Sequence, residues 1–143
     1  MLYTPLTKKA LRLCFDTHRD QLDKTGLPYV FHPFHLAEQM DDEISTVCAL
    51  LHDVVEDSDL SFEDLEKMGF PPEVIEVLRL LTHDTDVPYF DYVKMIASNP
   101  IAKKVKLADL THNSDLSRMD VIDQYALART EKYQKAIAML TNE

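Results

Sequence analysis

The sequence predicts an all-α fold. Helix-forming residues dominate, only two glycines occur in 143 residues, and the alternation typical of strands is nearly absent. This length suits one domain, residues 1–143, with a core of its own. The apolar fraction of 45% is ordinary for a globular protein and argues against wholesale disorder.

Helix start and stop signals along the chain predict about eight helices. They cover residues 5–22, 34–40, 42–57, 61–68, 73–81, 89–97, 101–116 and 121–140. The first carries Leu11, Cys14 and Phe15 at core-facing spacing. The segment containing Gly26 and Pro28 ends it, because both residues are poor inside helices.

The second and third helices have clear starting signals. Pro33 can begin the second, with His32 just before it, since the fixed φ of proline suits a first turn. Asp42 opens the third, which is expected to continue through the apolar residues 47–51 as far as Glu56 or Asp57.

Capping signals set the limits of the remaining helices. Ser61 and Asp64 form a capping-box pattern, and Gly69 ends that short helix. A proline pair then starts the fifth helix, and Pro100 starts the seventh after a polar loop over residues 82–88 and a sixth helix. No repeat, linker or low-complexity segment is present, so one domain is expected.

The net charge of −10 argues against broad binding to nucleic acid or to an anionic membrane. It still allows a small anionic substrate, because a bound divalent cation dominates its local field. Cys14 and Cys48 lie in apolar stretches and are expected to be buried thiols in a reducing compartment. No secretory segment or bilayer-spanning run is evident, so we expect a cytoplasmic protein.

Four polar residues interrupt an apolar helix at His52, Asp53, Glu56 and Asp57. Residues four apart on a helix share a face, which predicts His52 under Glu56 and Asp53 under Asp57. Buried charge is costly unless it is paired or bound to a metal. This cluster therefore favours a hydrolytic metal site.

His32 and Asp109 are candidates to complete that site, because each stands in or beside an apolar segment. Two imidazoles and two carboxylates suit a six-coordinate divalent ion with positions left open to water and substrate. Alternatively, each residue is a hydrogen-bonded core histidine or a helix cap, and for His32 alone we favour that reading. His35 could be a further ligand, although packing is its expected role.

Glu56 and Asp57 are the candidates for acid–base work. A carboxyl group beside a metal ion can orient the attacking water or pass a proton to the leaving alkoxide. The alternative is that both residues end a helix and remain solvated.

Substrate binding is carried by weaker signals. Arg19 and Lys24 are available cations, and surface cations are usually only solvated. Asn113 follows Asp109 by one helical turn, so the two side chains are expected to face the same way.

Together these motifs resemble a known family, the HD-domain metal-dependent phosphohydrolases, and within it the hydrolase domain of the RelA/SpoT type with its small stand-alone relatives. The matching segments are residues 18–21, 24–33, 50–58 and 105–109, with His112 and Asn113. The resemblance implies an all-helical HD bundle. It implies that one divalent ion, typically Mn²⁺ with Fe, Co, Ni, Zn or Mg as alternatives, is held by four residues: His32, His52, Asp53 and Asp109.

The same resemblance implies roles for the remaining candidates. Glu56 and Asp57 would serve water activation and proton transfer, and Lys24 and Asn113 would contact a nucleotide. The relatives remove pyrophosphate from the 3′ position of guanosine tetra- or pentaphosphate. We therefore expect a metal-dependent phosphohydrolase whose partner is a small nucleotide, most specifically a guanosine 3′,5′-bis(diphosphate) 3′-pyrophosphohydrolase. The alternatives are an HD hydrolase of another nucleotide or phosphate ester, such as a nucleoside monophosphate or NADPH, and a non-catalytic nucleotide sensor.

The chain departs from this family at residues expected to bind base and phosphate. Asp23 stands where the family usually has an arginine, and Leu110 and Asp115 stand where basic residues are common. The 82–88 loop also lacks the lysine found in relatives. The metal and acid–base set is complete, whereas the set that binds base and phosphate is thinned.

Overall fold

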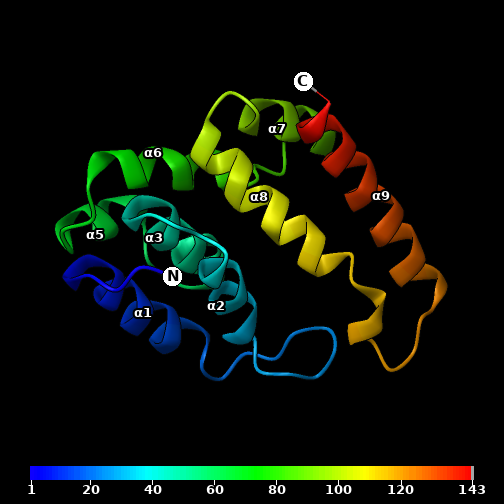
Figure 1. Cartoon of the computed structure of the whole chain (residues 1–143), viewed down its shortest axis with the longest axis horizontal. Helices are drawn as coiled ribbons and strands as arrows, with labels where there is room; N and C mark the ends of the chain where they lie inside the picture. The colour runs from blue at the N-terminus through cyan, green and yellow to red at the C-terminus, as the bar shows by residue number, and fades with distance from the viewer. Residues whose placement is uncertain (143) are drawn as a thin grey trace.

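The computed structural model describes residues 1–142, which form nine α-helices, one short 3₁₀ helix and no β-strand. The all-α prediction is confirmed (Figure 1). In chain order the elements are α1 (Pro5–His18), α2 (Phe31–Glu38), α3 (Glu43–Leu51), α4 (Val54–Asp57), α5 (Phe62–Lys67), α6 (Pro72–Leu81), α7 (Tyr89–Ile96), α8 (Pro100–Asn113), η1 (Leu116–Arg118) and α9 (Gln124–Thr141).

Helix α3 lies at the centre of the core, where it packs against α1, α2, α6 and α8. Every residue from Ser45 to Leu51 is buried, because this stretch is apolar on nearly all sides. Complete burial of a leucine such as Leu50 contributes about 1.5–3 kcal/mol. The core thus fixes the end of α3, which carries His52.

Helix α9 forms the outer layer on the other side of the molecule, alongside α8 and against α7 (Figure 1). Only a narrow stripe of it is buried: Ala126, Thr130, Ala136 and Leu140. Its other side chains are free to face solvent or the space between α9 and the rest of the fold. This placement brings the C-terminal part of the chain beside residues from α2, α3 and α8.

The expected single helix over residues 42–57 is wrong, because it breaks at His52 and Asp53 into α3 and α4. The Nδ1 atom of His52 bonds to the carbonyl oxygen of Ala49 at 2.7 Å. In an uninterrupted helix that carbonyl would accept from the backbone N–H of Asp53. The side chain competes for the acceptor, and this break is one reason that nine helices form instead of about eight.

Other helix limits differ by a few residues from the expected ones. Helix α1 ends at His18, and α2 begins at Phe31, so that His32 lies in its first turn and not before it. Helix α9 starts at Gln124 because the Asp123 side chain accepts from the backbone N–H of Ala126 and caps it. The capping box at Ser61 is confirmed.

Both cysteines are buried and free, as expected. Among residues 1–142, no helix is both long enough and apolar enough to cross a bilayer.

Candidate functional site

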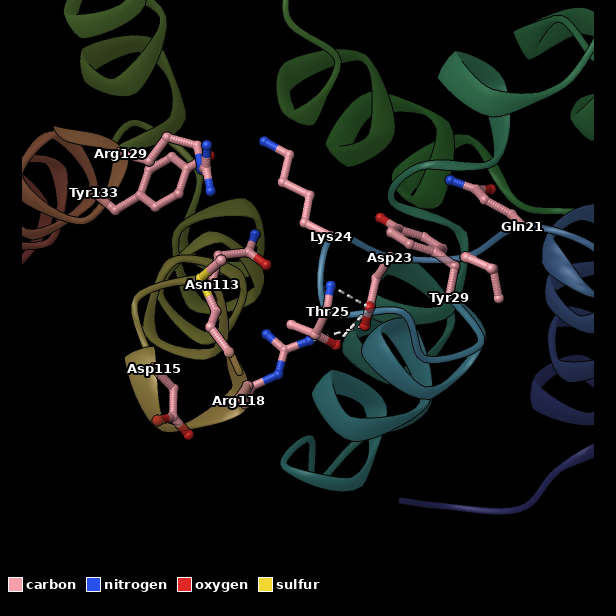
Figure 2. A pocket seen from close by; sticks show the side chains of 12 residues that line it. Gln21, Asp23, Lys24, Thr25, Tyr29, Asn113, Asp115, Arg118, Arg129 and Tyr133 are labelled. Atoms are coloured by element: carbon pink, nitrogen blue, oxygen red, sulfur yellow. Dashed lines mark hydrogen bonds and ion pairs between the residues drawn. The ribbon is translucent and has the colours of Figure 1, made fainter. Parts of the chain in front are cut away.

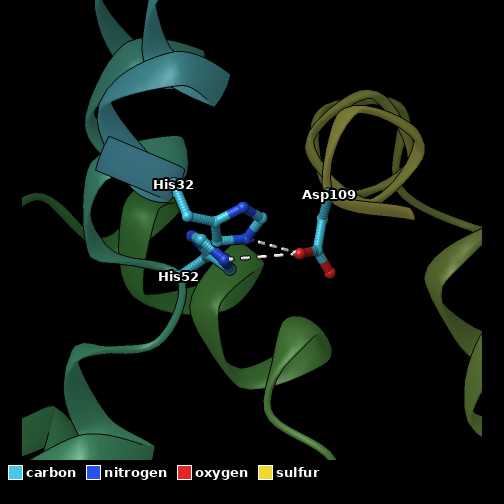
Figure 3. A group of neighbouring side chains, drawn as sticks. All are labelled: His32, His52 and Asp109. Atoms are coloured by element: carbon cyan, nitrogen blue, oxygen red, sulfur yellow. Dashed lines mark hydrogen bonds and ion pairs between the residues drawn. The ribbon is translucent and has the colours of Figure 1, made fainter. Parts of the chain in front are cut away.

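His32 of α2, Asp109 of α8 and His52, which directly follows α3, converge at one place (Figure 3). Their potential ligand atoms all lie within 4.8 Å of one another. His32 Nε2 is 2.8 Å from Asp109 Oδ1, and His52 Nε2 is 3.7 Å from the same oxygen. The structure therefore brings together residues that are 20 and 57 positions apart in the chain.

Asp53, the fourth predicted ligand, lies at the edge of this group. Its Oδ2 atom is 3.0 Å from His52 Nε2 and accepts a hydrogen bond from the Tyr29 hydroxyl. Burial disfavours the ionised Asp53 carboxyl, but the neighbouring His52 outweighs it and lowers the pKa of Asp53 to about 2. Asp53 is thus an ionised carboxylate directed at the same place.

The donor set fits a divalent metal ion. His52 uses Nδ1 to donate to Ala49, which leaves the lone pair of Nε2 facing the carboxylates of Asp53 and Asp109. This Nε2 atom is buried and has no hydrogen-bond partner. A cation among these groups removes the repulsion between a lone pair and two carboxylates.

The pKa values of His52 and Asp109 also indicate that this group favours a positive charge. Burial disfavours a charged His52, yet Asp53 and Asp109 outweigh it and hold the pKa of His52 well above its ordinary range. Burial likewise opposes ionisation of Asp109, but Lys106, His32 and His52 hold its pKa well below its usual value. Either a proton on His52 or a bound metal ion would place a positive charge between the carboxylates of Asp53 and Asp109.

Asp109 is held in place from two further directions. Lys106 Nζ lies 3.0 Å from its Oδ2 atom and above the Tyr92 ring. Asn113 Nδ2 donates to Oδ1 at 3.0 Å. The expectation that Asp109 and Asn113 share a face is therefore confirmed. The sequence marks Lys106 only as one of several available cations, although its spacing of three from Asp109 is a signal for contact on a helix.

His112 contacts His32 through Nδ1, whereas the sequence places His112 only among the residues that resemble the family and predicts no such contact. The Nδ1 atoms of the two rings are 2.7 Å apart, and the rings are stacked with 10° between their planes. Burial and the nearby Arg118 lower the pKa of His112 to about 4, so His112 is neutral. A neutral His112 can accept the Nδ1 proton of His32 and leave His32 Nε2 free to face the group.

A cavity of about 210 Å³, which we call the inner pocket, opens beside this group. Its lining includes His52, Asp53, Glu56, Lys106, Asp109 and Lys132. Glu56 Oε1 accepts a hydrogen bond from the backbone N–H of His83 at 3.1 Å. Burial and the charge of Asp53 raise the pKa of Glu56. The inner pocket thus combines the candidate metal ligands with a fixed carboxyl group.

Asp57 faces a different way from Glu56. Its Oδ2 atom accepts from Gln21 Nε2 at 3.3 Å, and Gln21 Oε1 is 2.8 Å from Nδ1 of the buried His18. Asp53 and Asp57 lie one helical turn apart, as predicted, because the backbone N–H of Asp57 donates to the carbonyl oxygen of Asp53 at 3.0 Å. The break between α3 and α4 falls before Asp53 and separates His52 from Glu56.

A second cavity of about 300 Å³, the outer pocket, lies between the loop after α1 and helix α9 (Figure 2). Its lining includes Lys24, Tyr29, Asn113, Arg118, Arg129 and Tyr133. Lys24 points toward Arg129 and Tyr133 across the opening. Burial, followed by the charges of Arg129 and Lys132, lowers the pKa of Lys24. No carboxylate among the described residues forms an ion pair with Lys24 or Arg129.

Two of the unusual acidic residues have local structural roles. Asp23 accepts from Thr25 and Leu27, and its other oxygen is 3.2 Å from Arg118 Nη2. Asp115 caps η1 through the backbone N–H of Ser117. Arg19, a predicted substrate-binding residue, lines neither pocket, because it lies at the exposed end of α1 with Asp20 as its neighbour.

No protein-family model matches the sequence. A guanosine-3′,5′-bis(diphosphate) 3′-pyrophosphohydrolase MESH1 from Danio rerio is 33% identical over 129 residues, which cover 80% of this chain and 71% of that protein. The MESH1 protein of Drosophila melanogaster is 37% identical over 109 residues, 67% of this chain and 60% of that protein. A guanosine-3′,5′-bis(diphosphate) 3′-pyrophosphohydrolase of Aquifex aeolicus is 31% identical over 148 residues, and the match spans 95% of this chain but 20% of that longer protein.

A solved structure gives the same result in three dimensions. It is described as a metazoan orthologue of SpoT that hydrolyses ppGpp and plays a role in starvation responses. The TM-score is 0.75 at 29% identity, with 98% of this chain and 87% of that chain covered.

Proposed function

This chain belongs to the HD-domain family of guanosine-3′,5′-bis(diphosphate) 3′-pyrophosphohydrolases, and from this premise we propose that it hydrolyses the 3′-pyrophosphate group from guanosine 3′,5′-bis(diphosphate). The observation that carries the proposal is the buried group of His32, His52 and Asp109, whose unpartnered His52 Nε2 faces two carboxylates beside the inner pocket. Hydrolysis of a phosphate ester needs such a site together with a cationic surface for the nucleotide.

We assign one divalent metal ion to His32, His52, Asp53 and Asp109, with Mn²⁺ favoured. Nitrogen and carboxylate donors suit a first-row divalent ion, and the closeness of both carboxylates to His52 supports this assignment. Such an ion supplies Lewis-acid polarisation of the scissile phosphoryl group and acidifies a water molecule.

Glu56 is assigned to activation of the attacking water. Its carboxyl lies in the inner pocket, and the His83 backbone holds one oxygen while the other is available to take a proton. The raised pKa of Glu56 brings its basicity closer to that needed for proton transfer near neutral pH.

Asp57 is assigned to proton transfer to the leaving 3′ oxygen. It lies next to Gln21, which lines the outer pocket, so it is on the side where the nucleoside would bind. The hydrogen bond from Gln21 holds one carboxyl oxygen, and the His18 contact fixes the orientation of the Gln21 amide.

The outer pocket is assigned to the nucleotide. Lys24 and Arg129 offer positive charges that no carboxylate of residues 1–142 neutralises, and Asn113 links this pocket to Asp109. Arg19 is left out of the assignment because it lines neither pocket.

The test is a hydrolysis assay on the purified, manganese-loaded protein. We expect guanosine 3′,5′-bis(diphosphate) to be converted into GDP and pyrophosphate at a rate far above that of a panel containing nucleoside monophosphates and NADPH. Metal-stripped protein is the control and should be inactive until manganese is restored. A rate on the guanosine substrate no higher than the panel background would reject this specificity, and full activity without metal would reject the mechanism.

A further inference from the structure

The inner pocket carries an excess of negative charge that the proposed metal ion offsets only in part. Three carboxylates line it, from Asp53, Glu56 and Asp109, and the Lys106 ammonium is already paired with Asp109. A diphosphate group entering this space adds several negative charges to a protein of net charge −10. A further cation at the pocket would offset this repulsion.

The 82–88 loop does not supply that cation. It contains His83, Asp84 and Asp86 but no lysine or arginine. The His83 backbone donates to Glu56, and its side chain bonds to the carbonyl oxygen of Val87 at 2.7 Å. The loop therefore positions Glu56 and brings no lysine or arginine to the pocket.

Lys132 of α9 supplies a cation at the same pocket. Its Nζ atom lies 4.5 Å from the centre of the Tyr89 ring and 5.5 Å from that of Tyr133, and both rings line the inner pocket. No carboxylate of the described residues pairs with Lys132. Aromatic faces attract an ammonium group without neutralising it, so they hold the charge at the pocket and leave it available.

The surroundings of Lys132 also favour an anion. Lys132 and Arg129 both act on Lys24 as like charges across the space between α9 and the loop after α1. Tyr133, which directly follows Lys132 in sequence, lines both pockets. Three cations that gather without carboxylate partners in an acidic protein repel one another unless an anion binds between them.

On the premise of the proposed function, we propose that Lys132 binds the 3′-diphosphate group in the inner pocket, and so takes the place of the loop lysine that this chain lacks. Lys24 and Arg129 then face the nucleoside and its 5′-phosphates in the outer pocket. The site would select nucleotides that carry phosphates at two separate positions, because each pocket holds its own cation.

The chain offers a matched control on the same helix. Lys135 also lies over an aromatic ring, with its Nζ atom 4.6 Å from the centre of Phe90, but it lines neither pocket. Lys132→Gln and Lys135→Gln each remove one exposed charge from α9 together with its cation–π contacts, two for Lys132 and one for Lys135. Only the first removes a charge from the inner pocket.

The experiment compares both variants with the parent protein, all manganese-loaded. For Lys132→Gln we expect the KM for guanosine 3′,5′-bis(diphosphate) and the Kd for inorganic pyrophosphate, measured by calorimetry, to rise about tenfold, with kcat changed less than about threefold. Lys132→Arg should restore most of the binding, and Lys135→Gln should match the parent. Unchanged thermal unfolding would show that all variants are folded.

Pyrophosphate binding separates this inference from the proposed function. If Lys132→Gln binds pyrophosphate as tightly as the parent, or if both glutamine variants weaken it equally, the role of Lys132 is overturned even though the parent is an active hydrolase. If the parent binds pyrophosphate through Lys132 but does not hydrolyse the guanosine substrate, the proposed function fails and the phosphate site stands.

Discussion

In the inner pocket the candidate metal ligands bond to neighbouring side chains, whereas in the outer pocket two cations, Lys24 and Arg129, have no carboxylate partner among the described residues. In the inner pocket, Asp109 alone contacts His32, His52, Lys106 and Asn113. In the outer pocket, Lys24 points into an opening and its main electrostatic neighbours are other positive charges. The inner pocket is held together by contacts among its own side chains, whereas the unpaired cations of the outer pocket favour the binding of an anionic ligand.

This difference between the pockets matches two functions, metal binding in the inner pocket and nucleotide binding in the outer one. A metal site must hold its ligands rigidly, and partners behind each ligand orient it. A nucleotide site must remain open and unsatisfied until the ligand arrives, because cations that are already paired bind phosphate weakly. Changes at the candidate metal ligands and at Glu56 should therefore abolish chemistry, while changes at cations that only bind phosphate, such as Lys24, should mainly weaken binding.

The largest effect is expected for loss of a ligand in the inner pocket. His52→Ala should lose bound metal and at least about 1000-fold in kcat/KM, because the metal contribution to phosphoryl transfer disappears. Elemental analysis and the pyrophosphate-release assay measure both. The exposed His35, which contacts His112 instead of the ligand group, is the control, and His35→Ala should keep its metal. A metal-free His35→Ala protein would make His35 a ligand after all.

Glu56→Gln should separate chemistry from metal binding within the same pocket. We expect kcat to fall by about 10²–10⁴-fold, since the variant can no longer accept a proton from water. Metal content should match the parent protein. The exposed Glu63 on α5 provides a control, because Glu63→Gln changes the same chemical group away from both pockets. Loss of metal from Glu56→Gln would mean that Glu56 is a ligand and not a base.

His112→Ala tests whether support behind a ligand matters in the inner pocket. Without the Nδ1 contact to His112, His32 loses the partner that orients its ring, and metal affinity should drop about 10–100-fold. Titration against a chelator gives this affinity directly. At saturating manganese, most of the activity should return. An unchanged affinity would show that His112 only packs against His32.

Lys24→Ala should have the opposite profile, because Lys24 lies in the outer pocket. We expect KM to rise about tenfold with kcat within about threefold of the parent, as one charge-assisted contact to the nucleotide is lost. Steady-state kinetics on the guanosine substrate separate the two constants. A fall in kcat with KM unchanged would contradict the assignment of Lys24 to nucleotide binding.

The smallest expected effect concerns Asp23, at the edge of the outer pocket. Burial opposes its ionisation, but hydrogen bonds from Thr25 and Leu27, together with Arg118, outweigh it and lower its pKa. Its charge therefore stabilises the fold above the ordinary aspartate pKa of about 3.9. That contribution is lost as the pH falls through the lowered pKa of the folded state.

Asp23→Asn should accordingly cost about 1 kcal/mol at pH 7, with little difference from the parent near pH 2 to 3. Urea unfolding at both pH values measures this. A deficit of equal size at low pH would show that the carboxylate charge is not the cause.

Local signals in the sequence gave most helices correctly because caps act over a few residues. Ser61 with Asp64 predicts the start of α5, and Pro100 marks the start of α8. The break at His52 was missed because it depends on a side chain taking the Ala49 carbonyl from the backbone. That contact ends α3 at Leu51, so α4 begins separately at Val54 and carries both Glu56 and Asp57.

The candidate metal ligands were predictable from the sequence, whereas the residues that α9 contributes to the two pockets were not. His32, His52, Asp53 and Asp109 stand out because polar groups in apolar segments are costly without a partner. Arg129, Lys132 and Tyr133 stand out in no such way, since charged and aromatic residues on a half-exposed helix are ordinary.

The sequence by itself predicted the all-α fold, which the structure confirms, and it singled out the candidate metal ligands and the candidate acid–base pair, because these predictions rest on periodicity, caps and the cost of burying charge. Tertiary structure decided where α9 lies. Only the packing of α9 against α7 and α8 brings Arg129 and Lys132 to the two pockets. Long-range packing has no local signature in the sequence. The sequence alone therefore did not indicate that α9 contributes cations to both pockets.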